Sequence, residues 1–194
     1  MRISLKFLVL VAAVLTAGAC SSSGGLIGPA DETQKAVELV SQANADLRKI
    51  RILYKENEGK RLELKNALES DSAAEVERLT NEVVQIINDG TNLGTGAVDL
   101  ISEAQMLNIH RDYKEYLRLK EEALRLQLSA FDNYRQAART LRDNYDPKNA
   151  GQRDKVKSIF EERSEAYRKI MEEARDASSR ANELYKETLQ REKT

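Results

Sequence analysis

The chain has 194 residues and is almost neutral, with 31 lysines and arginines against 32 aspartates and glutamates. Binding to nucleic acid needs a basic face for the phosphates, so this balance argues against a nucleic-acid partner. A single histidine excludes a multi-histidine zinc site within one chain, and no motif indicates a serine–histidine–aspartate site. We therefore expect a protein that is not an enzyme and has no metal or other cofactor.

Residues 1–19 have the layout of a secretion signal. Arg2 and Lys6 make the start basic, and the uncharged run FLVLVAAVL follows at residues 7–15. This run is much shorter than the roughly 20 residues that a membrane-spanning helix needs. The segment therefore predicts export of the chain, with the signal removed.

The only cysteine, Cys20, directly follows the small residues TAGA at positions 16–19. This segment resembles the lipobox of bacterial lipoproteins, with Ala17 where the family usually has leucine and Leu15 two residues earlier. The resemblance covers residues 1–20 only, and it implies cleavage before Cys20 and acylation of its thiol. Several acyl chains give firm attachment to a membrane, whereas one gives marginal binding.

Ser21 follows the cysteine, where the sorting pattern of the lipoprotein family has aspartate in proteins kept at the inner membrane. The resemblance therefore implies the bacterial cell envelope, and the outer membrane (periplasmic face or cell surface) over the inner one. The next residues, CSSSGGLIGPA at 20–30, are rich in serine and glycine. This composition is typical of a flexible linker, and we expect a tether.

The remaining residues, 31–194, are predicted to form one helical domain. No proline occurs between Asp31 and Pro147, and good helix formers predominate. Apolar positions recur in steps of three and four in four segments, which is the packing seam of left-handed helical bundles. The seam of the second segment is Val76, Leu79, Val83, Ile86, Gly90, Leu93, Ala97, Leu100, Ala104 and Leu107.

We predict an all-α, elongated, antiparallel (up-down-up-down) four-helix bundle with coiled-coil-like packing. Its helices are expected at about 31–69, 72–107, 109–145 and 152–191. A turn at 69–72 is followed by a capping-box pattern, Ser72 with Glu75. Proline and glycine within 146–151 end the third helix.

Two positions compete for the turn between the second and third helices. A turn near Asn108 gives four helices of similar length, which bury their seams from end to end. A turn within residues 88–96 places three glycines outside a helix interior, where each costs about 1 kcal/mol relative to alanine. We prefer the first position because the second leaves helices of very unequal length.

Charged residues interrupt the seams at Arg61, Lys120 and Arg163. One interpretation is a polar layer, or long stems that lie along the core with their charged ends in water. A sharper hypothesis is a pocket in which these three residues hold an anionic ligand. His110 lies on a seam at a helix start, where we expect a partly buried, hydrogen-bonded side chain. Leu107 three residues before it excludes the Glu-x-x-His pattern of di-iron bundles.

Small residues in the second and fourth helices suggest a close approach of their neighbours. Gly90, Gly94 and Gly96 on one, with Ala174, Ala177 and Ala181 on the other, are expected to leave room for Tyr113, Tyr116 and Leu117. The chain also has seven tyrosines. Most are expected in the core, and any that are exposed are candidates to anchor a protein partner.

The sequence indicates a lipid-anchored, non-enzymatic scaffold or adaptor that acts through helical protein–protein interaction. Its expected partners are the membrane, through the lipid on Cys20, and an envelope protein or a second copy of the chain. The alternative is a small-ligand-binding or sensing bundle with an internal polar pocket. A spacer linked to peptidoglycan through a terminal lysine is disfavoured, because Lys193 is followed by Thr194.

Overall fold

The computed structural model describes residues 31–191, without the side chains of residues 56, 57 and 188–191. The predicted signal at 1–19, Cys20 and the tether at 20–30 lie outside the described residues. Within them the chain is all-helical, and four helices pack against one another. They are α1 (Thr33–Glu69), α2 (Ala73–Met106), α3 (Arg111–Asn144) and α4 (Ala150–Arg191).

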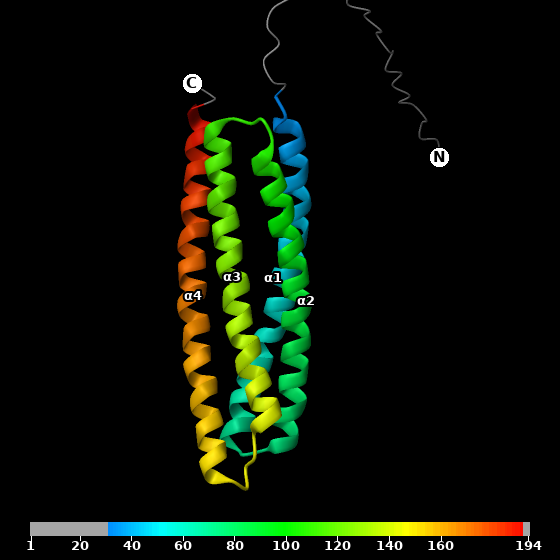
Figure 1. The fold of residues 1–194 in the computed structure, drawn as a ribbon, viewed down its shortest axis with the longest axis vertical. Helices are drawn as coiled ribbons and strands as arrows, with labels where there is room; N and C mark the ends of the chain where they lie inside the picture. Colours follow the sequence, from blue (N-terminus) through cyan, green and yellow to red (C-terminus); the bar gives the residue numbers. More distant parts are fainter. Residues whose placement is uncertain (1–30, 192–194) are drawn as a thin grey trace, which may run out of the picture.

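The four helices lie side by side along the long axis of the molecule (Figure 1). The start of α1, the connection between α2 and α3, and the end of α4 lie at one end, which we call the upper end. The other two connections lie at the lower end. The longest helix has 42 residues and is therefore about 63 Å long at 1.5 Å per residue.

The turn between α2 and α3 lies at residues 107–110, so the preferred prediction near Asn108 is confirmed. The three glycines at 90, 94 and 96 lie inside α2 without breaking it. Hydrogen bonds hold this turn to the start of α1, because the backbone N–H of Asn108 donates to the Glu32 carboxylate at 2.9 Å. The backbone N–H of Glu32 donates in return to the Asn108 carbonyl at 3.0 Å.

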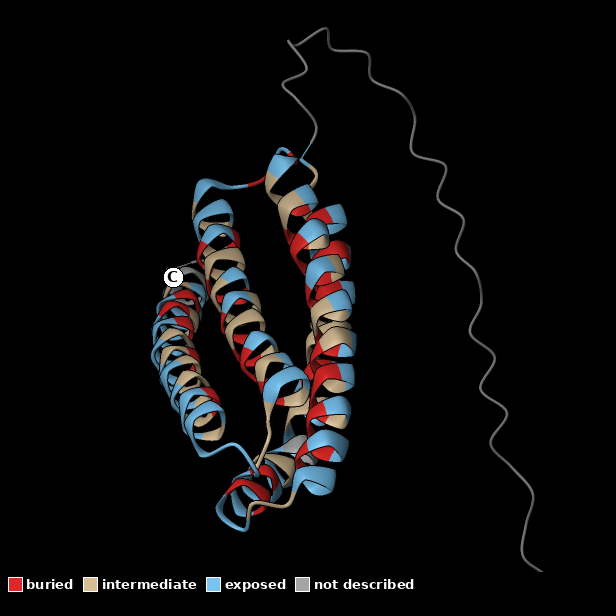
Figure 2. Ribbon diagram, turned by 60° about the horizontal axis from the view of Figure 1, so that its bottom comes forward, coloured by how far each residue is buried: buried red, intermediate tan, exposed pale blue. Residues whose placement is uncertain are grey.

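Buried residues lie on the inner sides of the helices and form three clusters along the axis (Figure 2). The upper cluster joins α1, α2 and α3, with Ala43, Ile101 and Leu117 among its buried members. The middle cluster includes Phe131 and Tyr134 of α3 and also Tyr167 of α4. The lower cluster draws buried residues from all four helices.

The helices pack unequally. Backbone packing is close between α1 and α2, α2 and α3, and α3 and α4, whereas α1 and α4 approach each other at most marginally. Ala174, Ala177 and Ala181 of α4 are almost fully buried. Because α3 is the only close neighbour of α4, these small residues let α4 lie flat on α3. Any contact between α1 and α4 therefore depends on long side chains.

The glycines of α2 face different residues of α3 from those that we expected. A Cβ at Gly94 would lie 2.5 Å from Cδ2 of Leu128, so any larger residue here would force the Leu128 side chain to move. A Cβ at Gly90 would meet only Phe131, at 3.9 Å, and one at Gly96 would meet nothing within 4 Å. The residues accommodated are thus Leu128 and Phe131, rather than the predicted tyrosines.

The turn at residues 70–72 is held by Asp71, which has a positive φ of 49°. Its carboxylate accepts hydrogen bonds from the Tyr145 hydroxyl at 2.7 Å, the Lys157 ammonium at 2.8 Å and the Arg153 guanidinium at 3.2 Å. The predicted capping box is wrong, because the Ser72 side chain makes no capping hydrogen bond. One carboxylate therefore joins the turn between α1 and α2 to the residue that follows α3 and to the start of α4.

Candidate ligand and partner grooves between α1 and α4

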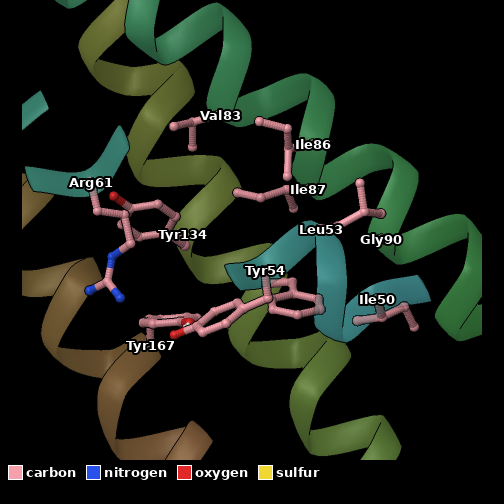
Figure 3. A pocket seen from close by; sticks show the side chains of 11 residues that line it. Ile50, Leu53, Tyr54, Arg61, Val83, Ile86, Ile87, Gly90, Tyr134 and Tyr167 are labelled. Atoms are coloured by element: carbon pink, nitrogen blue, oxygen red, sulfur yellow. Dashed lines mark hydrogen bonds between the residues drawn. The ribbon is translucent and has the colours of Figure 1, made fainter. Parts of the chain in front are cut away.

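Arg61 is the most unusual side chain on the side where α1 faces α4. Its guanidinium carbon lies 5.3 Å from the centre of the Tyr134 ring and 5.1 Å from that of Tyr167. Both distances fall within the range of cation–π attraction. Figure 3 shows the guanidinium beside these two rings and pointing away from the apolar side chains Val83, Ile87 and Ile50.

The tyrosines around Arg61 form a bonded set. The Tyr167 hydroxyl donates to the Tyr54 hydroxyl at 2.7 Å, which links α4 to α1 across the gap between their backbones. Burial, followed by this hydrogen bond, raises the pKa of Tyr167 far above its ordinary value. Burial likewise raises the pKa of Tyr134. Both phenols are therefore neutral at physiological pH and cannot neutralise the charge on Arg61.

Arg61 also has no ion-pair partner among the described side chains. Its neighbour Lys60 pairs with Glu82 across α1 and α2. A guanidinium presents five N–H donors around its edge, whereas the two tyrosine rings contact it through their π-faces. The guanidinium also hydrogen-bonds the Tyr134 side chain, and its remaining N–H donors have no carboxylate acceptor among the described residues.

The three charged residues predicted to share a pocket are not brought together. Lys120 lies over the Tyr116 ring, with its Nζ 5.8 Å from the centre, and burial lowers its pKa. Arg163 donates to the Gln136 side chain at 2.6 Å. Tyr134, which contacts Arg61, is fourteen residues from Lys120 along α3, so about 21 Å separates the two sites. Each charge therefore has separate surroundings.

A groove of about 500 Å³ runs between α1 and α4 beside Arg61, and we call it the lower groove. It is lined by Arg61, Lys65, Leu68, Glu69, Tyr134, Lys157, Phe160, Glu161, Ser164 and Arg168. Four of these side chains are cationic and two are anionic. Lys65 lies 3.7 Å from Glu69, Lys157 binds Asp71, and Arg168 pairs with Glu165. Arg61 is thus the cation in this lining that has no carboxylate partner among the described residues.

A small apolar cavity of about 50 Å³ lies on the other side of the tyrosine set. Its lining includes Ile50, Val83, Ile87, Gly90 and Phe131, together with Arg61 and the tyrosines at its edge. This volume is far below the several hundred cubic ångströms of a typical small-molecule pocket. The core is therefore nearly filled at the level of Arg61.

A second groove, of about 670 Å³, lies near the upper end, and we call it the upper groove. Val37 and Tyr185, two large apolar side chains with exposed fractions of 45% and 43%, line it together with Tyr113 and Tyr116. The Tyr116 ring stacks on Tyr113 at 5.6 Å and meets Tyr185 at 5.1 Å. Burial raises the pKa of Tyr116 to about 12, so its hydroxyl stays neutral. The groove joins an aromatic surface to polar side chains, which are Asp31, Thr33, Ser41, Asn44, Arg48, His110 and Asp112.

His110 differs from the sequence-based expectation because it is exposed. It is the N-cap residue of α3, and its Nδ1 accepts a hydrogen bond from the backbone N–H of Asp112 at 3.3 Å. Within residues 31–191, no group of three or more histidine, cysteine, aspartate or glutamate side chains is arranged to hold a metal ion. None of the helices in that range has the length and hydropathy of a membrane span.

Comparison with known proteins adds no relative: no protein-family model, curated protein or solved structure matches the chain.

Proposed function

We propose that the protein is a lipid-anchored, non-enzymatic adaptor of the bacterial cell envelope that binds another protein through the upper groove. The exposed apolar pair at this groove, Val37 of α1 and Tyr185 of α4, carries the proposal. Tyrosine is enriched where proteins bind one another, because it combines a large apolar ring with a hydroxyl group. The polar side chains around the rings supply the rim that such interfaces have.

The proposed anchor is an acylated Cys20, located at the outer membrane. The lipobox-like segment supports the acylation, and Ser21 in place of aspartate after the cysteine supports the outer membrane. The proposed fold is an elongated antiparallel bundle with coiled-coil-like packing. Its connections at alternate ends support this arrangement (Figure 1). The start of α1, the end of α4 and the upper groove then lie together at the membrane-proximal end.

Intact-mass spectrometry of the chain purified from bacterial membranes tests the anchor. We expect a mature chain that begins at Cys20 and carries several acyl groups. The matched control is Cys20→Ser, which should keep its signal and lack the acyl mass. A mature wild-type chain without acyl groups would overturn the anchor.

Site-specific photo-crosslinking in living cells tests the partner surface. A photoreactive residue at position 185 should give one discrete covalent product, identified by mass spectrometry as an envelope protein or as a second copy of this chain. The control is the same residue at Glu77, an exposed position on α2 that does not line the groove. Equal products from both positions, or none from position 185, would contradict the adaptor surface.

An internal ligand pocket is the less favoured function, because the apolar cavity beside Arg61 measures only about 50 Å³.

A further inference from the structure

We infer that the lower groove is a binding site for an oxyanion, a carboxylate or phosphate group, with the Arg61 guanidinium as its main ligand. The site differs from the predicted trio of charges, because neither Lys120 nor Arg163 lines this groove. It also differs from the proposed partner surface, which lies near the other end of the molecule.

The first argument is the position of the unsatisfied charge. Arg61 is held on one side by the rings of Tyr134 and Tyr167 and lines the groove on the other. Figure 3 shows the guanidinium nitrogens directed away from the apolar side chains. Arginine recognises carboxylate and phosphate through paired N–H donors at its edge. One donor of Arg61 is used by the Tyr134 side chain, and the others have no carboxylate acceptor among the described residues.

The second argument is an independent polar atom in the same groove. The Oγ of Ser164 is buried and has no hydrogen-bond partner among the described residues. Buried hydroxyl groups in native proteins nearly always have a partner, so an unpaired one needs an explanation. Ser164 precedes Tyr167 by three residues and therefore lies one turn from the ring that Arg61 covers. An oxyanion in the groove accepts from Arg61, and rotation of the Ser164 side chain about χ1 lets its hydroxyl donate to the same anion.

The third argument is the charge of the lining. Lys65, Lys157 and Arg168 add cationic charge to that of Arg61, against Glu69 and Glu161. The side chains that line the groove therefore carry a net positive charge, although the whole chain has a net charge of −1. A groove with a positive lining raises the local concentration of anions.

The tyrosine cluster also fixes the geometry of the site. The hydrogen bond between Tyr54 and Tyr167 ties α1 to α4 at the level of Arg61. The guanidinium is therefore held by two ring faces before any anion arrives, which lowers the entropy lost on binding. A lysine at this position has neither the planar fork nor the stacking surface.

The test uses the full chain purified in detergent, with sodium phosphate and sodium acetate as separate probes at constant ionic strength. Isothermal titration calorimetry and the thermal unfolding midpoint are measured for each. We expect saturable binding of at least one of the two anions and a rise in the midpoint. Binding of phosphate alone identifies a phosphate group as the ligand, and binding of acetate alone identifies a carboxylate. Absence of saturable binding for both anions overturns the inference.

Arg61→Met removes the guanidinium and keeps a stem that packs on the tyrosines, and it should weaken binding at least tenfold. The matched control is Arg163→Met, which removes a cation that lies outside the groove and should leave affinity unchanged. Equal affinities for these two variants contradict the site. If far-UV circular dichroism shows that Arg61→Met does not fold, the affinity of Ser164→Ala for the anion tests the site instead. This substitution removes a hydroxyl group with no partner among the described residues, and it should weaken binding several-fold, while an unchanged affinity overturns the inference.

Discussion

The two halves of α4 differ in how they relate to the rest of the bundle. In the lower half, Val156, Phe160 and Tyr167 pack into clusters shared with α1, α2 and α3. In the upper half, the buried residues are alanines that lie on α3, and the upper cluster contains no residue of α4. Side-chain size explains the difference, because α1 and α4 are too far apart for an alanine to bridge. The lower half of α4 is thus part of the core, whereas its upper half packs on the surface of α3.

This difference also separates the two grooves. Near the hydrogen bond between Tyr167 and Tyr54, the gap between α1 and α4 forms a groove with more cationic than anionic side chains. At the upper end, tyrosine rings line a larger groove that Tyr185 leaves partly open. The two grooves thus differ in whether an aromatic side chain of α4 is hydrogen-bonded to α1.

The largest predicted effect compares the same substitution in the two halves of α4. Tyr167→Ala should lower the free energy of unfolding by about 3–5 kcal/mol, because it empties a buried ring position and removes the hydrogen bond to Tyr54. Tyr185→Ala should cost less than about 1 kcal/mol, since Tyr185 is an exposed surface residue. Urea unfolding followed by circular dichroism measures both. Similar losses would mean that the upper half of α4 is also part of the core.

Overpacking tests the contact of α4 with α3. Ala177 is fully buried, so Ala177→Leu should force α4 away from α3 and lower the free energy of unfolding by about 1–3 kcal/mol. Asp176→Leu, at the adjacent exposed position, is the control and should change it by less than about 0.5 kcal/mol. Equal effects in the two variants would show that α4 does not lie flat on α3.

A smaller effect compares two glycines of α2. Gly90→Ala should raise the free energy of unfolding by about 1 kcal/mol, because alanine is the better helix former and its Cβ meets only Phe131 at 3.9 Å. At Gly94 the same change brings the Cβ to 2.5 Å from Leu128, so strain should offset the gain. Thermal unfolding should therefore rank Gly90→Ala above Gly94→Ala. A higher midpoint for Gly94→Ala than for Gly90→Ala would show that the free space lies beside Gly94.

The smallest effect concerns Asp71 at the lower end. The hydrogen bond from Lys157, with that from Tyr145, lowers the pKa of this carboxyl group below its ordinary value. A lowered folded-state pKa stabilises the fold above the unfolded-state value near 3.9. That stability is lost as the pH falls through the folded-state pKa. Unfolding between pH 6 and pH 2 should therefore show an acid decline that is shallower in Asp71→Asn.

Asparagine is the suitable replacement at this position because it tolerates the positive φ of 49°. The comparison therefore changes the charge without straining the turn. An identical pH profile for Asp71→Asn and the wild type would show that the interactions of the Asp71 carboxylate contribute nothing to the pH dependence of stability.

The predicted helices were placed well by the sequence, with ends that differ from the structure by about two residues, the usual uncertainty at helix ends. The fourth helix begins at Ala150, earlier than predicted, because the Asn149 side chain accepts from the backbone N–H of Gln152. The turn near Asn108 was also identified. By contrast, sequence reasoning singled out Arg61 and missed its surroundings. Tyr54, Tyr134 and Tyr167 belong to three helices, and no spacing along the chain indicates that they meet.

The sequence by itself determined the helical class, the four segments and the position of each turn, because helix periodicity and helix-breaking residues act over a few neighbouring residues. The tertiary structure alone decided which seams meet. It gave Arg61, Lys120 and Arg163 separate partners, left α1 and α4 without close backbone packing, and joined Asp71 to Tyr145 and to two cations of α4. These outcomes depend on the sizes of side chains that lie far apart in the chain. The candidate sites follow from them, since both grooves lie where α4 fails to close on α1.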